Sequence, residues 1–245
     1  FSVIVVASVG TFIIACGVMA KTNVTTNDNI PIAMDSKKAF KVEFKSDPAI
    51  IQSGATAKMT FTVKNEKGDL VKDLQIVHEK PMHLLIVSKD LAEFAHIHPE
   101  VQADGTYKVE YVFPNGGEYK LYADITPKDS TQVVEQIDVK VGGTERAKVE
   151  LVPDQMLEKT VDGLSVVMAP DSEIQAGREL TINFKVFDAG SGKPATDLEN
   201  YLGALAHFVI ISEDMKDFVH AHPMEKGETM GSMKMEGGKD DDHNK

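Results

Sequence analysis

The sequence is poor in cysteine, tryptophan and basic side chains. Its 245 residues contain one cysteine and no tryptophan. A single cysteine excludes an intrachain disulfide, so a folded domain must be held together by its hydrophobic core. There are 26 lysines and arginines against 38 acidic residues, which gives a formal net charge of −12. Because nucleic acids are bound through basic surfaces, we expect no nucleic-acid partner.

An apolar, uncharged run opens the sequence at residues 1–15, FSVIVVASVGTFIIA. It is shorter than the roughly 20 residues that a membrane-spanning helix needs and fits the apolar part of an export signal. Ile13-Ile14-Ala15-Cys16 resembles the bacterial lipobox, in which a small residue precedes the lipidated cysteine. We therefore expect residues 1–16 to be a lipoprotein signal peptide, with Cys16 anchoring the protein to a membrane of the bacterial cell envelope, on the periplasmic side or at the cell surface. The alternative is a buried strand with a chance cysteine.

Two segments of the chain repeat each other. Residues 82–99 read MHLLIVSKDLAEFAHIHP, and residues 206–223 read AHFVIISEDMKDFVHAHP. His83 corresponds to His207, and the other shared residues keep the same offset, so a chance match is implausible. We divide the chain into a flexible tether and two copies of one module, followed by a Met-rich flexible tail. The ranges are 17–37 for the tether, 38–143 and 144–223 for the modules, and 224–245 for the tail.

The first copy consists of short segments in which β-branched and aromatic residues alternate with polar ones, separated by turn compositions such as Pro114-Asn115-Gly116-Gly117. This period of two predicts strands, and no segment has the period of a long helix. Strands of this length and number are typical of an immunoglobulin-like β-sandwich. The predicted strands are Ala39–Lys45, Ala57–Lys64, His83–Ser88, Tyr107–Phe113, Glu118–Asp124 and Val133–Val141.

The second copy is incomplete, because the residues after Pro223 contain no strand-like run. The counterpart of Thr106–Val141 is missing, which would leave an apolar face and an unpaired strand edge. Three explanations remain open: the sequence is truncated, a partner such as another envelope protein completes or docks on the module, or the module folds poorly. The predicted fold class is thus all-β, with two tandem immunoglobulin-like sandwiches, the second incomplete.

The repeated histidines suggest a metal site in each module. If residues 83–98 form a hairpin in which Ser88 opposes Glu93, His83 opposes His98, and His96 shares their face. The same hairpin register in the second copy places His207, His220 and His222 together. Three neutral imidazoles with one open position suit zinc, and imidazole also suits copper. A register slip by one residue would send His83 to the other face.

Other residues carry weaker indications. The repeated imidazoles could instead be structural, since Leu85, Val87 and Phe94 share their face. His78 has no counterpart in the second copy, and Ser88, Asp90, Ser212 and Asp214 resemble turn residues. Thioethers favour Cu(I), so methionines of the tail are additional candidate soft-metal ligands, although a flexible tail that happens to contain them is the simpler interpretation. They are Met230, Met233 and Met235.

With its His-Leu-x-Ile-x-Ser-x-Asp-Leu…Phe-x-His-x-His-Pro pattern, the chain resembles the exported bacterial β-sandwich modules known as YtkA-like or FixH-like, in their tandem form. The resemblance covers roughly residues 38–223. It implies export, a sandwich fold and a role in handling metal, copper in particular.

Two functions compete at this stage. The first is an envelope lipoprotein that binds a transition metal, copper before zinc, through three histidines in each module and acts as a buffer or carrier. The alternative is a non-catalytic interaction or adhesion module with structural histidines. We expect no enzyme: a metal with an open position could activate water, but no acid–base partner recurs beside the histidines.

Overall fold

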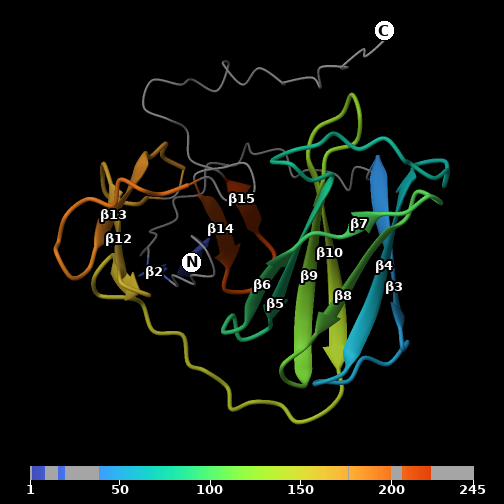
Figure 1. Ribbon diagram of the computed structural model, residues 1–245, viewed down its shortest axis with the longest axis horizontal. Helices are drawn as coiled ribbons and strands as arrows, with labels where there is room; N and C mark the ends of the chain where they lie inside the picture. The colour runs from blue at the N-terminus through green and yellow to red at the C-terminus, as the bar shows by residue number, and fades with distance from the viewer. Residues whose placement is uncertain (1, 9–15, 20–38, 176, 200–205, 222–245) are drawn as a thin grey trace, which may run out of the picture.

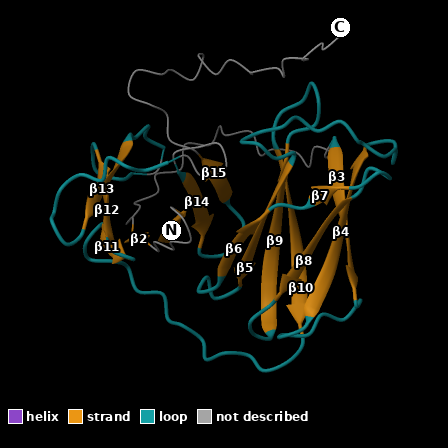
Figure 2. Cartoon of the chain, viewed as in Figure 1, coloured by secondary structure: helices purple, strands orange, loops and turns teal. Residues whose placement is uncertain are grey.

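The structure, a computed structural model, describes residues 2–8, 16–19, 39–175, 177–199 and 206–221 (Figure 1). Strands and the loops between them make up all of these segments, and the predicted all-β fold is confirmed (Figure 2). Within this part of the chain, no helix has the length and apolar character that crossing a membrane requires.

The first module is a sandwich of two four-stranded antiparallel sheets. Its apolar core lies between the sheets and includes Met59, Phe61, Leu84 and Leu121. All six predicted strands are present, and their ends agree to within two residues. One sheet has the order β3 (Phe40–Asp47), β4 (Thr56–Asn65), β8 (Tyr107–Val112), β7 (Glu100–Val101), and the other has the order β10 (Val133–Val141), β9 (Gly117–Ile125), β5 (Met82–Ser88), β6 (Phe94–Ile97).

Strand β5 is buried along its whole length, unlike β4, whose side chains alternate between the core and the outer face. Leu84 and Ile86 point into the core of the first module. Leu85 and Val87 point the other way, into a second apolar cluster shared with the second module. A strand covered on both faces has a continuous apolar sequence, and Leu84–Val87 has this character.

The turn between β5 and β6 is fixed by side-chain hydrogen bonds. The Ser88 hydroxyl donates to Asp90 Oδ1 over 2.7 Å and accepts from the Glu93 amide over 2.8 Å. Leu91 takes a left-handed conformation with φ 58°. The second module repeats the turn: Ser212 donates to Asp214 over 2.7 Å, and Met215 has φ 58°. These serines and aspartates therefore act as turn residues, as the sequence predicts.

The second module also has two sheets, and its apolar contacts join Val166 and Phe184 of one sheet to Phe208 of the other. The Phe184 and Phe208 rings stack with centroids 4.0 Å apart. One sheet has the order β11 (Glu158–Val161), β12 (Leu164–Pro170), β13 (Ile182–Asp188), and the other has the order β15 (Phe218–Ala221), β14 (His207–Ser212), β1 (Ser2–Ser8), β2 (Cys16–Met19).

Strand β1 lies antiparallel to β14, with Ser8 opposite His207. It occupies the edge of β14 that corresponds to the β9 edge of β5, where Asp124 is opposite His83. The apolar N-terminal segment thus forms a strand in this structure, and Cys16 begins the next one. Its role as an export signal with a lipidated cysteine stays a prediction.

The first module covers the open face of the second. Val209 and Ile211 of β14 are buried together with Leu85 and Val87 of β5, and we call this group the inter-module cluster. Figure 1 shows β14 and β15 between the first module and the rest of the second. The apolar face that the incomplete module was expected to expose is therefore covered within the same chain. The cluster also contains Leu91, Tyr122 and Met215, with Phe94, Val134, Leu151 and Phe218 packed against it.

Polar contacts reinforce this docking. The Tyr122 hydroxyl donates to the Met215 carbonyl over 3.1 Å, and the Tyr122 ring stacks on Phe218 with centroids 4.3 Å apart. Arg146, in the segment that joins the modules, contacts Asp90 and lies 3.1 Å from Glu93. The connecting segment is therefore attached to the β5–β6 turn, which forms one side of the interface.

Candidate metal centre

Both hairpins have the predicted register. Leu85 pairs with His96 in the first, and Val209 pairs with His220 in the second. The Ser88 amide donates to the Glu93 carbonyl over 3.0 Å, which confirms the pairing on which the histidine prediction depends. Because directly paired residues share a face, the histidines of each hairpin project toward the inter-module cluster.

His83 is at the centre of the first group. Its side chain is buried, with 4% exposed. Nε2 lies 2.9 Å from the Val77 carbonyl, which can only accept, so Nε2 carries the proton and the Nδ1 lone pair points inward. His96 Nε2 and His98 Nε2 each lie 3.1 Å from that Nδ1. Neighbouring ligands of a tetrahedral zinc ion are about 3.3 Å apart, so these spacings suit metal coordination.

The second module contributes His207 and His220. His207 is fully buried, and its Nδ1 lies 3.4 Å from His220 Nε2. The His220 ring centroid is 5.1 Å from that of His96 and 5.4 Å from that of His83. The sequence suggests two separate groups of histidines. The structure instead places the described members of both groups in one cluster between the modules.

Asp124 on β9 orients the second group from the first module. Its carboxylate is buried and accepts from His220 Nδ1 over 2.9 Å. Gln132 Nε2 donates to both carboxylate oxygens over 2.8 Å. A carboxylate bound to one ring nitrogen leaves the other as the ligand atom, an arrangement common behind metal-binding histidines. Here, Nε2 of His220 is left for the cluster.

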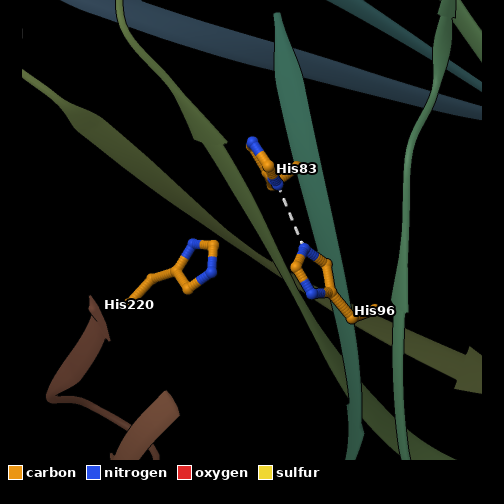
Figure 3. Close-up of side chains that lie close together, drawn as sticks. All are labelled: His83, His96 and His220. Atoms are coloured by element: carbon orange, nitrogen blue, oxygen red, sulfur yellow. Dashed lines mark hydrogen bonds between the residues drawn. The ribbon is translucent and has the colours of Figure 1, made fainter. Parts of the chain in front are cut away.

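His83, His96 and His220 could hold a metal ion (Figure 3). One ligand atom from each lies within 4.8 Å of the others. Figure 3 shows that His220 approaches the two histidines of the first module from the facing hairpin. Each module supplies part of this group, so the site forms only when the modules are docked.

The remaining predicted site residues are only partly described. His98 joins the cluster, whereas His222, Met230, Met233 and Met235 lie outside the described residues, as do almost all of the predicted tether and the predicted tail. The sequence reasoning missed two residues. His78 was set aside, yet its ring lies 6.1 Å from that of His207. Asp124 was not considered because its position opposite His83 depends on the pairing of β5 with β9.

Burial keeps the histidines of the first module uncharged. Burial, and then the neighbouring imidazoles, lowers the pKa of His96 to about 2. The same causes lower the pKa of His98 to about 4, and burial lowers the pKa of His83 and of His78. Neutral imidazole is the form that binds a metal ion, so these histidines of the first module are in their binding form at neutral pH.

These pKa values predict a metal-free protein that loses stability in acid. Below pH 6.5, His96 and His98 bind protons in the unfolded chain but stay unprotonated in the folded protein. The free energy of unfolding therefore falls as the pH falls. The expected slope is about 1.4 kcal/mol per pH unit for His96 and smaller for the partly exposed His98, whose interactions are screened by solvent. Urea unfolding at pH 7.5, 6.5 and 5.5 measures it. A double His96→Gln, His98→Gln variant should show a flatter profile, and equal slopes would refute the assignment.

The fold and the site define an all-β protein of two docked sandwich modules that share a histidine cluster able to hold a metal ion. The chain belongs to the family described as "Domain of unknown function (DUF8832)", whose profile matches residues 35–143 and 159–239.

Among solved structures, the chain is similar to the PmoD soluble domain from Methylocystis sp. ATCC 49242 (Rockwell), at 21% identity and a TM-score of 0.30 over 42% of this chain and 90% of that chain. None of the curated proteins matches. The function must therefore be inferred from the cluster itself.

Proposed function

We propose that this protein binds a transition-metal ion in the histidine cluster between the modules and serves as a metal buffer or carrier, with copper favoured over zinc. The observation that carries the proposal is the convergence of His96 and His98 Nε2 on the inward Nδ1 of His83, at 3.1 Å each. A purely structural histidine needs only one hydrogen-bond partner at this nitrogen, and here there are two. Imidazole suits both copper and zinc, and the Met-rich tail adds weight to copper.

The role that we propose is non-catalytic and located in the cell envelope. The lipobox-like Ile13-Ile14-Ala15-Cys16 supports a lipid anchor that holds the protein at a membrane. The resemblance to YtkA-like and FixH-like modules supports export and copper handling, and it stays a prediction. No substrate is needed for this role, since buffering requires only that the ion binds and leaves.

Competition titration with Cu(I), Cu(II) and Zn(II) tests the proposal on the full chain in detergent. The intact protein should bind tightly, and a double His96→Ala, His98→Ala variant should bind roughly 100-fold or more weakly, beyond the usual effect of losing an outer hydrogen-bond partner. His243→Ala, outside the repeated motif, is the matched control and should change nothing. Weak binding that is the same in all three proteins would make the interaction module the better interpretation.

Asp124 should affect the same measurement without being a ligand. Asp124→Asn keeps the size of the side chain but removes the charge that accepts from His220 Nδ1. We expect metal affinity to fall about 10- to 100-fold. Asp138→Asn, an exposed carboxylate on neighbouring β10, is the control and should leave affinity unchanged. Equal effects of the two substitutions would show that Asp124 acts only through net charge.

A further inference from the structure

The ring nitrogens of the cluster fall into two sets. In the first set, His83 Nδ1 lies 3.1 Å from Nε2 of His96 and 3.1 Å from Nε2 of His98. In the second set, His207 Nδ1 lies 3.4 Å from His220 Nε2. These values are close to the roughly 3.3 Å between neighbouring ligands of one tetrahedral ion. The His83–His96, His83–His98 and His207–His220 contacts therefore each have the spacing of two neighbouring ligands on one ion.

A single ion shared across the modules fits less well. The ligand atoms of His83, His96 and His220 spread over as much as 4.8 Å. Two nitrogens bound to one ion at about 2.05 Å each can be no more than about 4.1 Å apart. Any pair in the cross-module group that is more than about 4.1 Å apart would have to move closer around one ion, whereas the His83–His96, His83–His98 and His207–His220 contacts already lie within that limit.

The two sets are nevertheless in contact. The His96 ring centroid is 5.1 Å from that of His220 and 5.3 Å from that of His207. Outer contacts also hold each set in place: the Val77 carbonyl accepts from His83, and the Asp124 carboxylate accepts from His220. Ions bound to the two sets would be immediate neighbours in one centre.

The charge of the centre selects the kind of ion. Its described ligands are imidazoles, which carry no negative charge, and the Asp124 carboxylate pairs with His220. Repulsion between two ions scales with the product of their charges, so it is four times larger for a divalent pair than for a monovalent pair at the same separation. Two ions held this close together therefore favour monovalent charge, and Cu(I) is the monovalent ion that suits imidazole.

We propose that the histidine cluster between the modules is a two-ion centre that holds a pair of neighbouring Cu(I) ions, one on His83, His96 and His98 and the other on His207 and His220. This inference rests on the proposed metal-binding function and specifies its cargo. Separate sites in each module would be independent, whereas neighbouring ions in one centre influence each other's binding.

Native mass spectrometry of the full chain, loaded anaerobically with Cu(I) or with Zn(II), tests the pair. We expect two Cu(I) ions per chain, one Zn(II) ion per chain, and one Cu(I) ion in His207→Ala. A chain with Met230, Met233 and Met235 changed to leucine should still hold two Cu(I) ions. If it holds one, the second ion belongs to the tail and the proposal is wrong. Two Zn(II) ions would overturn the choice of a monovalent pair.

These outcomes distinguish the two-ion centre from the proposed metal-binding function on which it rests. One Cu(I) ion in the intact chain would refute the pair but leave metal binding intact, whereas no bound ion would refute both. X-ray absorption of the intact Cu(I)-loaded protein gives a second readout that needs no substitution. A copper–copper scattering contribution is expected, and its absence would overturn the two-ion centre even if His207→Ala fails to fold.

Discussion

Saturating the full chain with its preferred metal ion is expected to raise the midpoint of thermal unfolding by about 5–15 °C. A ligand present at 100 to 1,000 times its dissociation constant adds about 3–4 kcal/mol to folding stability, and each kcal/mol shifts the midpoint of a protein of this size by about 2–4 °C. The candidate ligands come from β5, β6 and β15, so metal bound in this centre fixes histidines of both modules. Calorimetry with and without the metal measures the shift.

His83→Ala should abolish this shift. His83 Nδ1 is the atom on which both His96 and His98 converge, so its loss removes the centre of the first set. The substitution also leaves a cavity and lowers the stability of the metal-free protein, so the readout is the difference that metal makes within each variant. Lys89→Ala, an exposed change in the same hairpin turn, should retain the full shift. An undiminished shift in His83→Ala would place the ion elsewhere.

Local patterns were sufficient to predict the strands and the hairpin registers. In each hairpin the turn is made by neighbours in sequence, with Ser88 and Asp90 in the first and Ser212 and Asp214 in the second. Once the turn is set, the alternation of side chains decides which residues share a face. The positions of His83, His96 and His98 on one face follow from this short-range geometry.

The union of the two histidine groups could not be predicted in the same way. It depends on β14 packing against β5, and these strands are far apart in the sequence. One indication was present: Leu84–Val87 and Phe208–Ile211 are unbroken apolar runs, which indicate strands covered on both faces. Asp124 has no such indication, since its place beside His220 requires both the pairing of β5 with β9 and the docking of the modules.

Tyr122→Ala is expected to separate the modules, with a loss of about 3–5 kcal/mol in the free energy of unfolding. Tyr122 is fully buried in the inter-module cluster, where it stacks on Phe218 and donates to the Met215 carbonyl. It lies outside the core of the first module, so that module should stay folded. Urea unfolding should then show two transitions in place of one.

The conservative Tyr122→Phe variant distinguishes packing from hydrogen bonding. It keeps the stacked ring and removes only the bond to Met215, so a loss of about 1 kcal/mol is expected. Metal binding should follow the docking: it should be nearly unchanged in Tyr122→Phe and reduced in Tyr122→Ala, because His220 moves away from the first module with the rest of the second. Exposed Val152 and Met156 in the connecting segment offer sites where proteolysis would report the separation. If Tyr122→Ala retained full metal affinity, binding would not depend on the docked arrangement, and the ion would belong to the first module alone.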